Sequence, residues 1–138
     1  MSKRTEKLAE LYKKANNMND ELPKELIEKL SLYGQILEII GGLHAEAVKA
    51  WKLAEANRRE VIAAAIAYGA ELEGAETPKT AKEREAAAEV AGAEARKKEA
   101  LAEYEATRWK NAYMSTLEMI QILKKKYEHL SNIAKGGI

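Results

Sequence analysis

The sequence predicts an all-α protein: a long antiparallel helical hairpin, of the coiled-coil type, with a short N-terminal helix at its open end. Three observations predict this fold. The chain of 138 residues has no Phe, and 33% of its residues are charged, which is typical of long helices. Two long segments carry apolar residues in alternating steps of four and three. A single stretch with Gly, Thr and Pro separates them. The length predicts one domain.

A short N-terminal helix is predicted over about residues 4–18. Its apolar side chains follow steps of three and four residues, which places them on one face: Leu8, Leu11, Ala15 and Met18. The asparagines that follow end this helix, because their side chains compete for backbone hydrogen bonds. Asp20 can cap the next helix, with Pro23 in its first turn.

The second predicted helix spans about residues 22–73. Twelve of fourteen positions in its repeating stripe are apolar or aromatic: Leu26, Leu30, Tyr33, Leu37, Ile40, His44, Ala47, Trp51, Ala54, Arg58, Val61, Ala65, Tyr68 and Leu72. This heptad pattern predicts a coiled-coil seam. The adjacent glycines Gly41 and Gly42 predict a kink, a break, or a close approach by the N-terminal helix.

The third predicted helix spans about residues 78–134 and repeats the pattern. The side chains of its seam are small in the first half and large in the second. The seam consists of Ala88, Gly92, Ala95, Glu99, Ala102, Ala106, Trp109, Tyr113, Thr116, Ile120, Leu123, Tyr127, Leu130 and Ala134. Gly74 can end the preceding helix in a left-handed conformation. Thr77–Pro78 can begin the third helix as cap and first residue, and Thr80 with Glu83 offers a competing start.

A reversal near residue 76 pairs residues whose numbers sum to about 153, such as Val61 with Gly92. Large residues then face small ones, as interdigitated packing requires. Arg58 comes within one turn of Glu99, so the two could pair across the hairpin and control the register. The N-terminal helix is expected to cover the off-seam apolar residues at the open end: Ile36, Ile39, Leu43, Ala112, Met119 and Ile122.

Further apolar residues would form a second stripe beyond the reach of that helix: Leu53, Ile62, Ile66, Val90 and Leu101. Exposed contiguous apolar surface usually marks an interface, so we expect self-association through this stripe. The alternative is a set of scattered surface aliphatics, which is common in monomers.

The sequence shows no pattern typical of an enzyme, a metal site or a cofactor site. His44 and His129 have no acidic or histidine partner at metal-ligand spacing, and no phosphate loop or nucleophile motif occurs. Several basic and aromatic residues could contact an anion such as a nucleic acid or a nucleotide: Arg58, Arg59, Arg108, Trp109 and Lys110. The favoured interpretation of these residues is helix surface balanced by nearby glutamates. We therefore expect no enzyme and no cofactor.

Location and partners are bounded by composition. The chain has no Cys, a net charge of +1 and no apolar run near the length of a membrane span. We expect a cytoplasmic protein, in the host cell if a phage encodes it, with no membrane partner. The expected partners are a second copy of the chain and another protein.

The region from Trp51 to Tyr127 resembles small helical-hairpin proteins encoded by tailed bacteriophages and prophages. The resemblance is carried by WKLAEANRREVIAAAIAYGAELEG, a polar turn, and KEREAAAEVAGAEARKKEALAEYEATRWKNAYMSTLEMIQILKKKYE. The shared features are Tyr68 on the first helix, the turn at 74–80 and the Arg108–Trp109 step. The resemblance covers a little over half of the chain, brings no catalytic residues with it, and implies a gene near phage recombination or replication functions.

These observations lead to three hypotheses about function. The first is a non-enzymatic phage-type interaction protein, accessory to DNA recombination or replication. The second is a phage inhibitor of host defence that binds a nuclease effector or sequesters a nucleotide signal. The third is a structural or scaffolding component.

Overall fold

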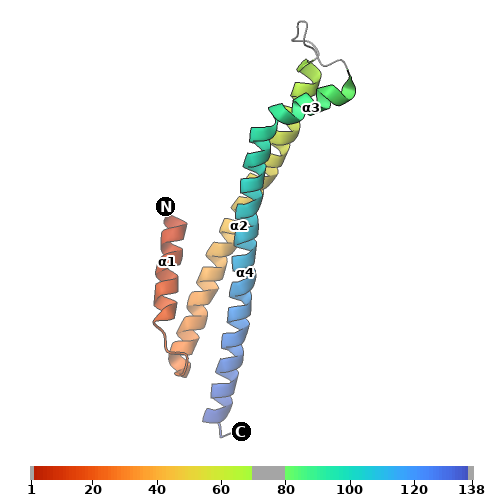
Figure 1. The fold of residues 1–138 in the computed structure, drawn as a ribbon. Helices are drawn as coiled ribbons and strands as arrows, with labels where there is room; N and C mark the ends of the chain where they lie inside the picture. Colours follow the sequence, from red (N-terminus) through yellow and green to blue (C-terminus); the bar gives the residue numbers. More distant parts are fainter. Residues whose placement is uncertain (1, 70–79, 137–138) are drawn as a thin grey trace. The chain divides into compact units, whose positions relative to one another are not determined.

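The computed structural model describes residues 2–69 and 80–136 of the chain, and this part is almost entirely helical. Its elements are α1 (Lys3–Asn16), α2 (Pro23–Gly69), α3 (Ala81–Ala91) and α4 (Ala93–Ala134), shown in Figure 1. No strand occurs among the described residues. The predicted all-α class is therefore confirmed.

The helix starts follow side-chain capping in two places. Ser2 caps α1, its hydroxyl oxygen accepting a hydrogen bond from the Thr5 amide at 3.2 Å. Thr80 caps α3 in the same way, accepting from the Glu83 amide at 3.1 Å. Thr80 is thus the start favoured by the structure, while Gly74, Thr77 and Pro78 lie outside the described residues.

Two sequence expectations need correction at helix ends. Asp20 does not cap α2; its carboxylate instead accepts a hydrogen bond from Lys29 Nζ at 2.6 Å. The helix predicted over 78–134 is also interrupted, because α3 ends at Ala91 and α4 begins at Ala93. Gly92 lies between them, where its missing side chain lets Ile62 approach closely. The backbone bond from the Gly92 amide to the Ala88 carbonyl, at 2.9 Å, keeps the chain tightly wound there.

The chain divides into two compact units. Unit 1 comprises Met1–His44 with Arg108–Ile138, and unit 2 comprises Ala45–Thr107. Whether they make up one domain, as the length predicts, stays a prediction.

Unit 1 holds the larger core, to which three helices contribute. Its buried members are Leu8, Leu11 and Ala15 from α1, Leu26, Tyr33, Ile36 and Ile40 from α2, and Leu123 from α4. Tyr12 and Tyr33 add an edge-to-face contact between α1 and α2, with ring centroids 6.4 Å apart. The expectation that α1 covers Ile36 is confirmed. The same expectation is wrong for Met119 and Ile122, which stay exposed on α4.

The connection between α1 and α2 is tied to both longer helices of unit 1. Asp20 pairs with Lys29 of α2, and Lys126 of α4 donates to Glu21 at 2.8 Å. Lys126 also lies 3.8 Å from the other carboxylate oxygen of Asp20. These ion pairs hold residues 17–22 between two helices.

The two adjacent glycines do not break α2, which runs from Pro23 to Gly69 without interruption. A Cβ built on Gly42 would lie 3.6 Å from Nη1 of Arg4, on α1. A Cβ on Gly41 would lie 3.4 Å from a ring carbon of Tyr113, on α4. The N-terminal helix therefore approaches this site, as one of the alternatives predicted, through the side chain of Arg4. The predicted break in the helix is wrong.

Unit 2 has a core of small residues. Ala88, Gly92, Ala95 and Ala106 are buried there. A Cβ built on Gly92 would lie only 2.7 Å from Cγ1 of Ile62, so Ile62, one residue after the expected Val61, provides the nearest side chain. Arg58 Nε donates to Glu99 Oε2, which joins α2 to α4 as the expected register predicted.

Burial follows the two predicted stripes within each unit. Every stripe residue on α2 from Leu26 to Ala65 is buried or half-buried. The same holds on α3 and α4 from Ala88 to Leu130, and only Ala134 is exposed. Leu72 and the side chain of Tyr68 lie outside the described part of the chain.

Candidate interaction surfaces

The five residues expected to form a second apolar stripe do not share one surface. Leu53, Ile66, Val90 and Leu101 are exposed, with exposed fractions of 62%, 38%, 78% and 67%. Ile62 is half-buried against Gly92, so its side chain fills the interior of unit 2. Leu53 and Ile66 are thirteen residues apart on α2, a rotation of roughly 220°, and therefore point to different sides. The prediction that these five residues form a single apolar stripe is therefore wrong.

Leu101 lies on the outer side of α4, with a second apolar residue beside it. Tyr104, one helical turn further on, has an exposed fraction of 64%. In the part of α4 that belongs to unit 2, residues 93–107, the residues within about 60° of Leu101 around the helix axis are all exposed, and we call them the Leu101 face: Glu94, Lys97, Lys98, Leu101, Tyr104 and Glu105. The buried residues Ala95 and Ala106 lie more than about 100° away from Leu101 around the same axis.

The Leu101 face carries charges of both signs. Glu94 and Lys97 come before Leu101, and Glu105 comes after it. Lys97 Nζ lies 3.6 Å from Glu94 Oε1, and their side chains are 74% and 81% exposed. Such an exposed pair on one helix contributes little to stability, so both charges remain accessible to a partner.

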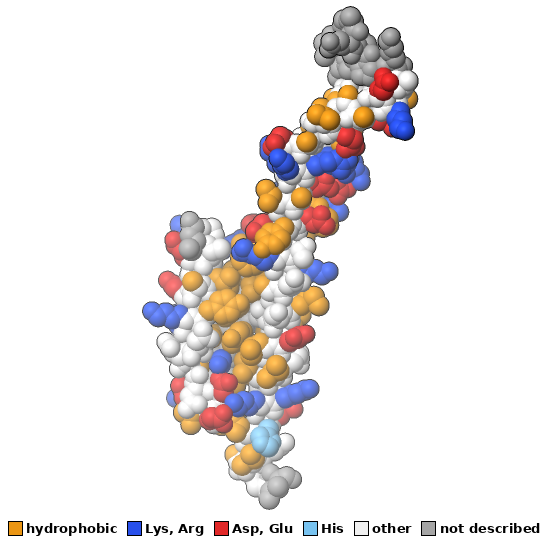
Figure 2. Space-filling model, in the orientation of Figure 1, with side chains coloured by type: hydrophobic (Ala, Val, Ile, Leu, Met, Phe, Trp, Pro, Cys, Tyr) orange, Lys and Arg blue, Asp and Glu red, His pale blue; other side chains and the backbone are white. Residues whose placement is uncertain are grey.

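A groove in unit 1 is the second candidate surface. It has a volume of about 190 Å³ and is lined by one residue from α1, one from α2 and four from α4: Tyr12, Tyr33, Ala112, Ser115, Thr116 and Met119. Figure 2 shows hydrophobic side chains gathered between α1 and α4. Thr116 is buried, and its hydroxyl donates to the Ala112 carbonyl at 2.7 Å, so the groove wall carries a satisfied polar group.

The groove continues into exposed apolar residues on α4. Met119 is 38% exposed and Ile122, about one turn further, is 58% exposed. The ion pair between Lys126 and Glu21 lies one turn beyond Ile122. This side of unit 1 therefore offers an apolar strip that ends in charged residues.

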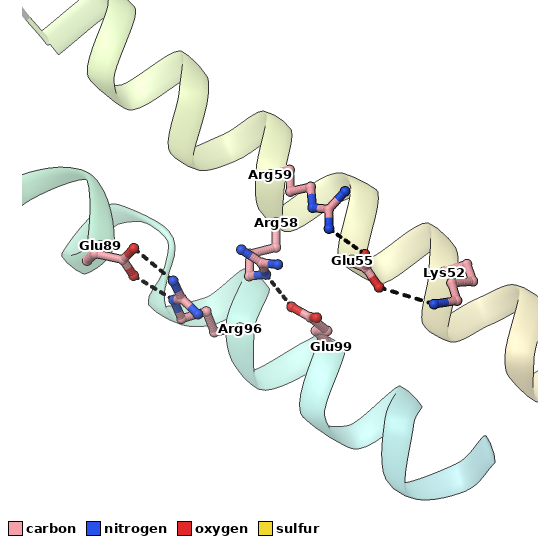
Figure 3. Close-up of polar contacts among 7 residues, drawn as sticks. All are labelled: Lys52, Glu55, Arg58, Arg59, Glu89, Arg96 and Glu99. Carbon is pink, nitrogen blue, oxygen red and sulfur yellow. Dashed lines mark hydrogen bonds and ion pairs between the residues drawn. The ribbon is translucent and has the colours of Figure 1, made fainter. Parts of the chain in front are cut away.

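Four of the five residues expected to contact an anion have other partners in the structure. Arg58 binds Glu99, and Arg59 Nη2 lies 2.8 Å from Glu55 Oε1, as Figure 3 shows. Arg108 and Trp109 lie in unit 1, where the guanidinium carbon of Arg108 is 5.2 Å from the Trp109 ring centroid. Lys110 is exposed. The carboxylates beside Arg58 and Arg59 reduce their attraction for an anion.

Arg96 and Glu89 connect α4 to α3 in unit 2. Two hydrogen bonds, at 2.6 and 2.7 Å, join the guanidinium to the carboxylate (Figure 3). The hydrogen bond from Arg96 lowers the pKa of Glu89, and the same bond raises the pKa of Arg96. This bidentate pair spans the interruption at Gly92, and because both side chains are about half exposed it contributes little to stability.

The described residues show no arrangement for metal chemistry. No group of three His, Asp or Glu side chains in 2–69 and 80–136 is placed to hold a metal ion. His44 is half-buried in unit 1, and His129 is exposed near the end of α4. Among the same residues, none of the helices combines the length and apolar character of a membrane span.

Two features of these surfaces were not predicted from the sequence. Tyr104 was not expected at an interface, although its spacing of three from Leu101, away from the seam, is the signal that identifies it. The groove depends on how α1 leaves Met119 and Ile122 uncovered, which no local pattern reveals.

Comparison with family models, with curated proteins and with solved structures gives no match to this chain.

Proposed function

We propose that this chain is a non-enzymatic helical interaction protein that binds another protein in the groove of unit 1. The observation that carries the proposal is the exposed apolar strip of Met119, which lines the groove, and Ile122, one turn further along α4. Exposed contiguous apolar residues of this kind are typical of protein interfaces. A partner helix with an apolar face suits a groove between two helices.

The resemblance to small phage-encoded hairpin proteins gives this role its setting. In that setting, the chain assists DNA recombination or replication through protein contacts. The architecture that we propose for it is the helical hairpin. Two contacts in unit 2 support the hairpin: Arg58 contacts Glu99, and Ile62 contacts Gly92. Residue numbers therefore rise along α2 while they fall along the helices that pack against it.

Site-specific photocrosslinking tests the proposal in cells that produce the chain naturally. A photoreactive amino acid at Ile122 should capture a discrete protein, identified by mass spectrometry. The matched control carries the same amino acid at Glu128, which is also exposed on α4 and lies about 120° away around the helix. Equal products from both positions would contradict the groove as a binding site.

The identity of the captured protein also separates the three functional hypotheses. A recombination or replication protein supports the first. A nuclease effector of host defence points to an inhibitor, and a virion protein points to a structural component. Ser115→Glu, at the lining of the groove, should reduce capture at Ile122 by at least about tenfold if the partner buries this surface, because burial of an unpaired charge is costly.

A further inference from the structure

We propose that the Leu101 face pairs with the Leu101 face of a second copy of the chain, with the two α4 helices antiparallel and Leu101 at the two-fold axis. The proposal rests on the proposed function in taking the chain to be an interaction protein, but it uses a different surface. Leu101 and Tyr104 are 67% and 64% exposed and supply the apolar centre of this contact. A two-fold contact requires a patch that is complementary to itself.

The charges of the Leu101 face meet that requirement. Lys97 and Glu105 lie four residues before and four residues after Leu101. In an antiparallel pair centred on Leu101, Lys97 of each copy faces Glu105 of the other, so two ion pairs flank the apolar centre. Lys98 then faces Tyr104, three residues on either side of Leu101, where its ammonium can lie over the ring.

The alternative arrangements bring like charges together. A parallel pair places Lys97 opposite Lys97 and Glu105 opposite Glu105. An antiparallel pair moved so that Leu101 faces Tyr104 places Lys97 opposite Arg108. Opposed like charges disfavour both arrangements, so the charge pattern favours the antiparallel pair centred on Leu101 over these two.

Charge reversal on the full-length chain tests the pairing by sedimentation equilibrium. Lys97→Glu and Glu105→Lys should each weaken dimerisation at least about tenfold, because each sets like charges opposite one another. The double variant K97E/E105K should restore wild-type dimerisation. The two residues are eight apart on one helix, about 12 Å along its axis, so they cannot form an ion pair within one copy. Restoration therefore reports a contact between copies, and a double variant as weak as the single ones would overturn the proposal.

A second measurement uses the absence of cysteine from the chain. Leu101→Cys should form a disulfide-linked dimer under mild oxidation, because only a residue at the two-fold axis meets its own copy. Glu94→Cys is the matched control: it is exposed on the same face, and its two copies would lie about 21 Å apart. Equal cross-linking at both positions, or a wild-type chain that is monomeric at every concentration, would refute the pairing. Capture at Ile122 would be unaffected by either result, so the proposed function is judged separately.

Discussion

Arg58 on α2 and Glu99 on α4 form an ion pair inside unit 2, with side chains that are only 20% and 19% exposed. The neighbouring interface residues are small, Ala95 and Ala102 among them. A charge placed there without its partner would lose water and gain nothing in return. The pair therefore fixes which residues of the two helices lie opposite each other.

Removing one member of this pair should destabilise unit 2. We expect Glu99→Ala to lower the free energy of unfolding by about 1–3 kcal/mol, because it leaves Arg58 shielded from water without its carboxylate. Urea denaturation followed by circular dichroism measures this. The double variant R58L/E99L should recover most of the loss. The exposed Glu89 provides a control, since Glu89→Ala should change stability little.

The same substitution should have opposite effects at two glycines. A Cβ at Gly92 would lie 2.7 Å from Cγ1 of Ile62, whereas a Cβ at Gly34 would meet no atom within 4 Å. Gly92→Ala should therefore cost about 1–3 kcal/mol through overpacking. Gly34→Ala should stabilise by about 0.5–1 kcal/mol through helix propensity. Thermal unfolding of both variants checks the signs.

Ile62 identifies the cause of the Gly92 effect. In the background of Ile62→Ala, the atoms that obstruct a Cβ at position 92 are gone. Gly92→Ala should then cost much less than in the wild-type chain, and a double-mutant cycle measures the coupling between the two positions. Equal costs in both backgrounds would show that the cost of Gly92→Ala does not come from contact with Ile62.

The position of α1 depends on a few buried residues. Leu11 is 2% exposed in the core of unit 1, so Leu11→Ala should cost about 2–5 kcal/mol. Leu53→Ala removes the same atoms from a side chain that is 62% exposed and should stay within about 0.5 kcal/mol of wild type. Comparable losses at the two positions would contradict the packing of α1 described above.

Acid should weaken the attachment of the α1–α2 connection. The hydrogen bond from Lys29 holds the pKa of Asp20 below its usual value of 3.8, and Lys126 adds to the effect. Because the folded pKa is the lower one, this stabilisation is present above about pH 4 and is lost as pH falls through the folded pKa. Asp20→Asn should flatten the dependence of unfolding free energy on pH below 4, and parallel curves for both proteins would refute this.

Alkali should act on the other side of the same cluster. The hydrogen bond to Glu21 raises the pKa of Lys126 above its usual value of 10.5. Stabilisation from Lys126 is therefore complete below that value and is lost as pH rises through the folded pKa. The neutral range between these two limits is where the connection is held most firmly.

The spacing of apolar residues predicted the helices and their buried sides well, because every third or fourth residue of a helix lies on the same side of it. The stripe from Leu26 to Ala65 and the stripe from Ala88 to Leu130 are buried or half-buried as expected. Arg58 and Glu99 could be paired in advance because both interrupt an apolar stripe. Capping chemistry likewise identified Thr80 as one of two starts.

The remaining features depend on contacts between distant segments. Gly92 fitted the helical pattern, and its closeness to Ile62 of α2 follows from how the helices pack. Ile62 looked like a surface residue because its outer position was judged from an ideal repeat. Asp20 had the chemistry of a helix cap, yet two lysines from α2 and α4 compete for its carboxylate. None of these outcomes is encoded in a local window of sequence.

The six residues between α1 and α2, anchored by Lys29 and Lys126, have a consequence for α1 itself. A helix of 14 residues is marginal on its own in water. A short connection keeps such a segment at an effective concentration on the order of millimolar beside its binding site. Three buried side chains can therefore hold α1 in place, although a separate peptide of the same sequence would dissociate readily.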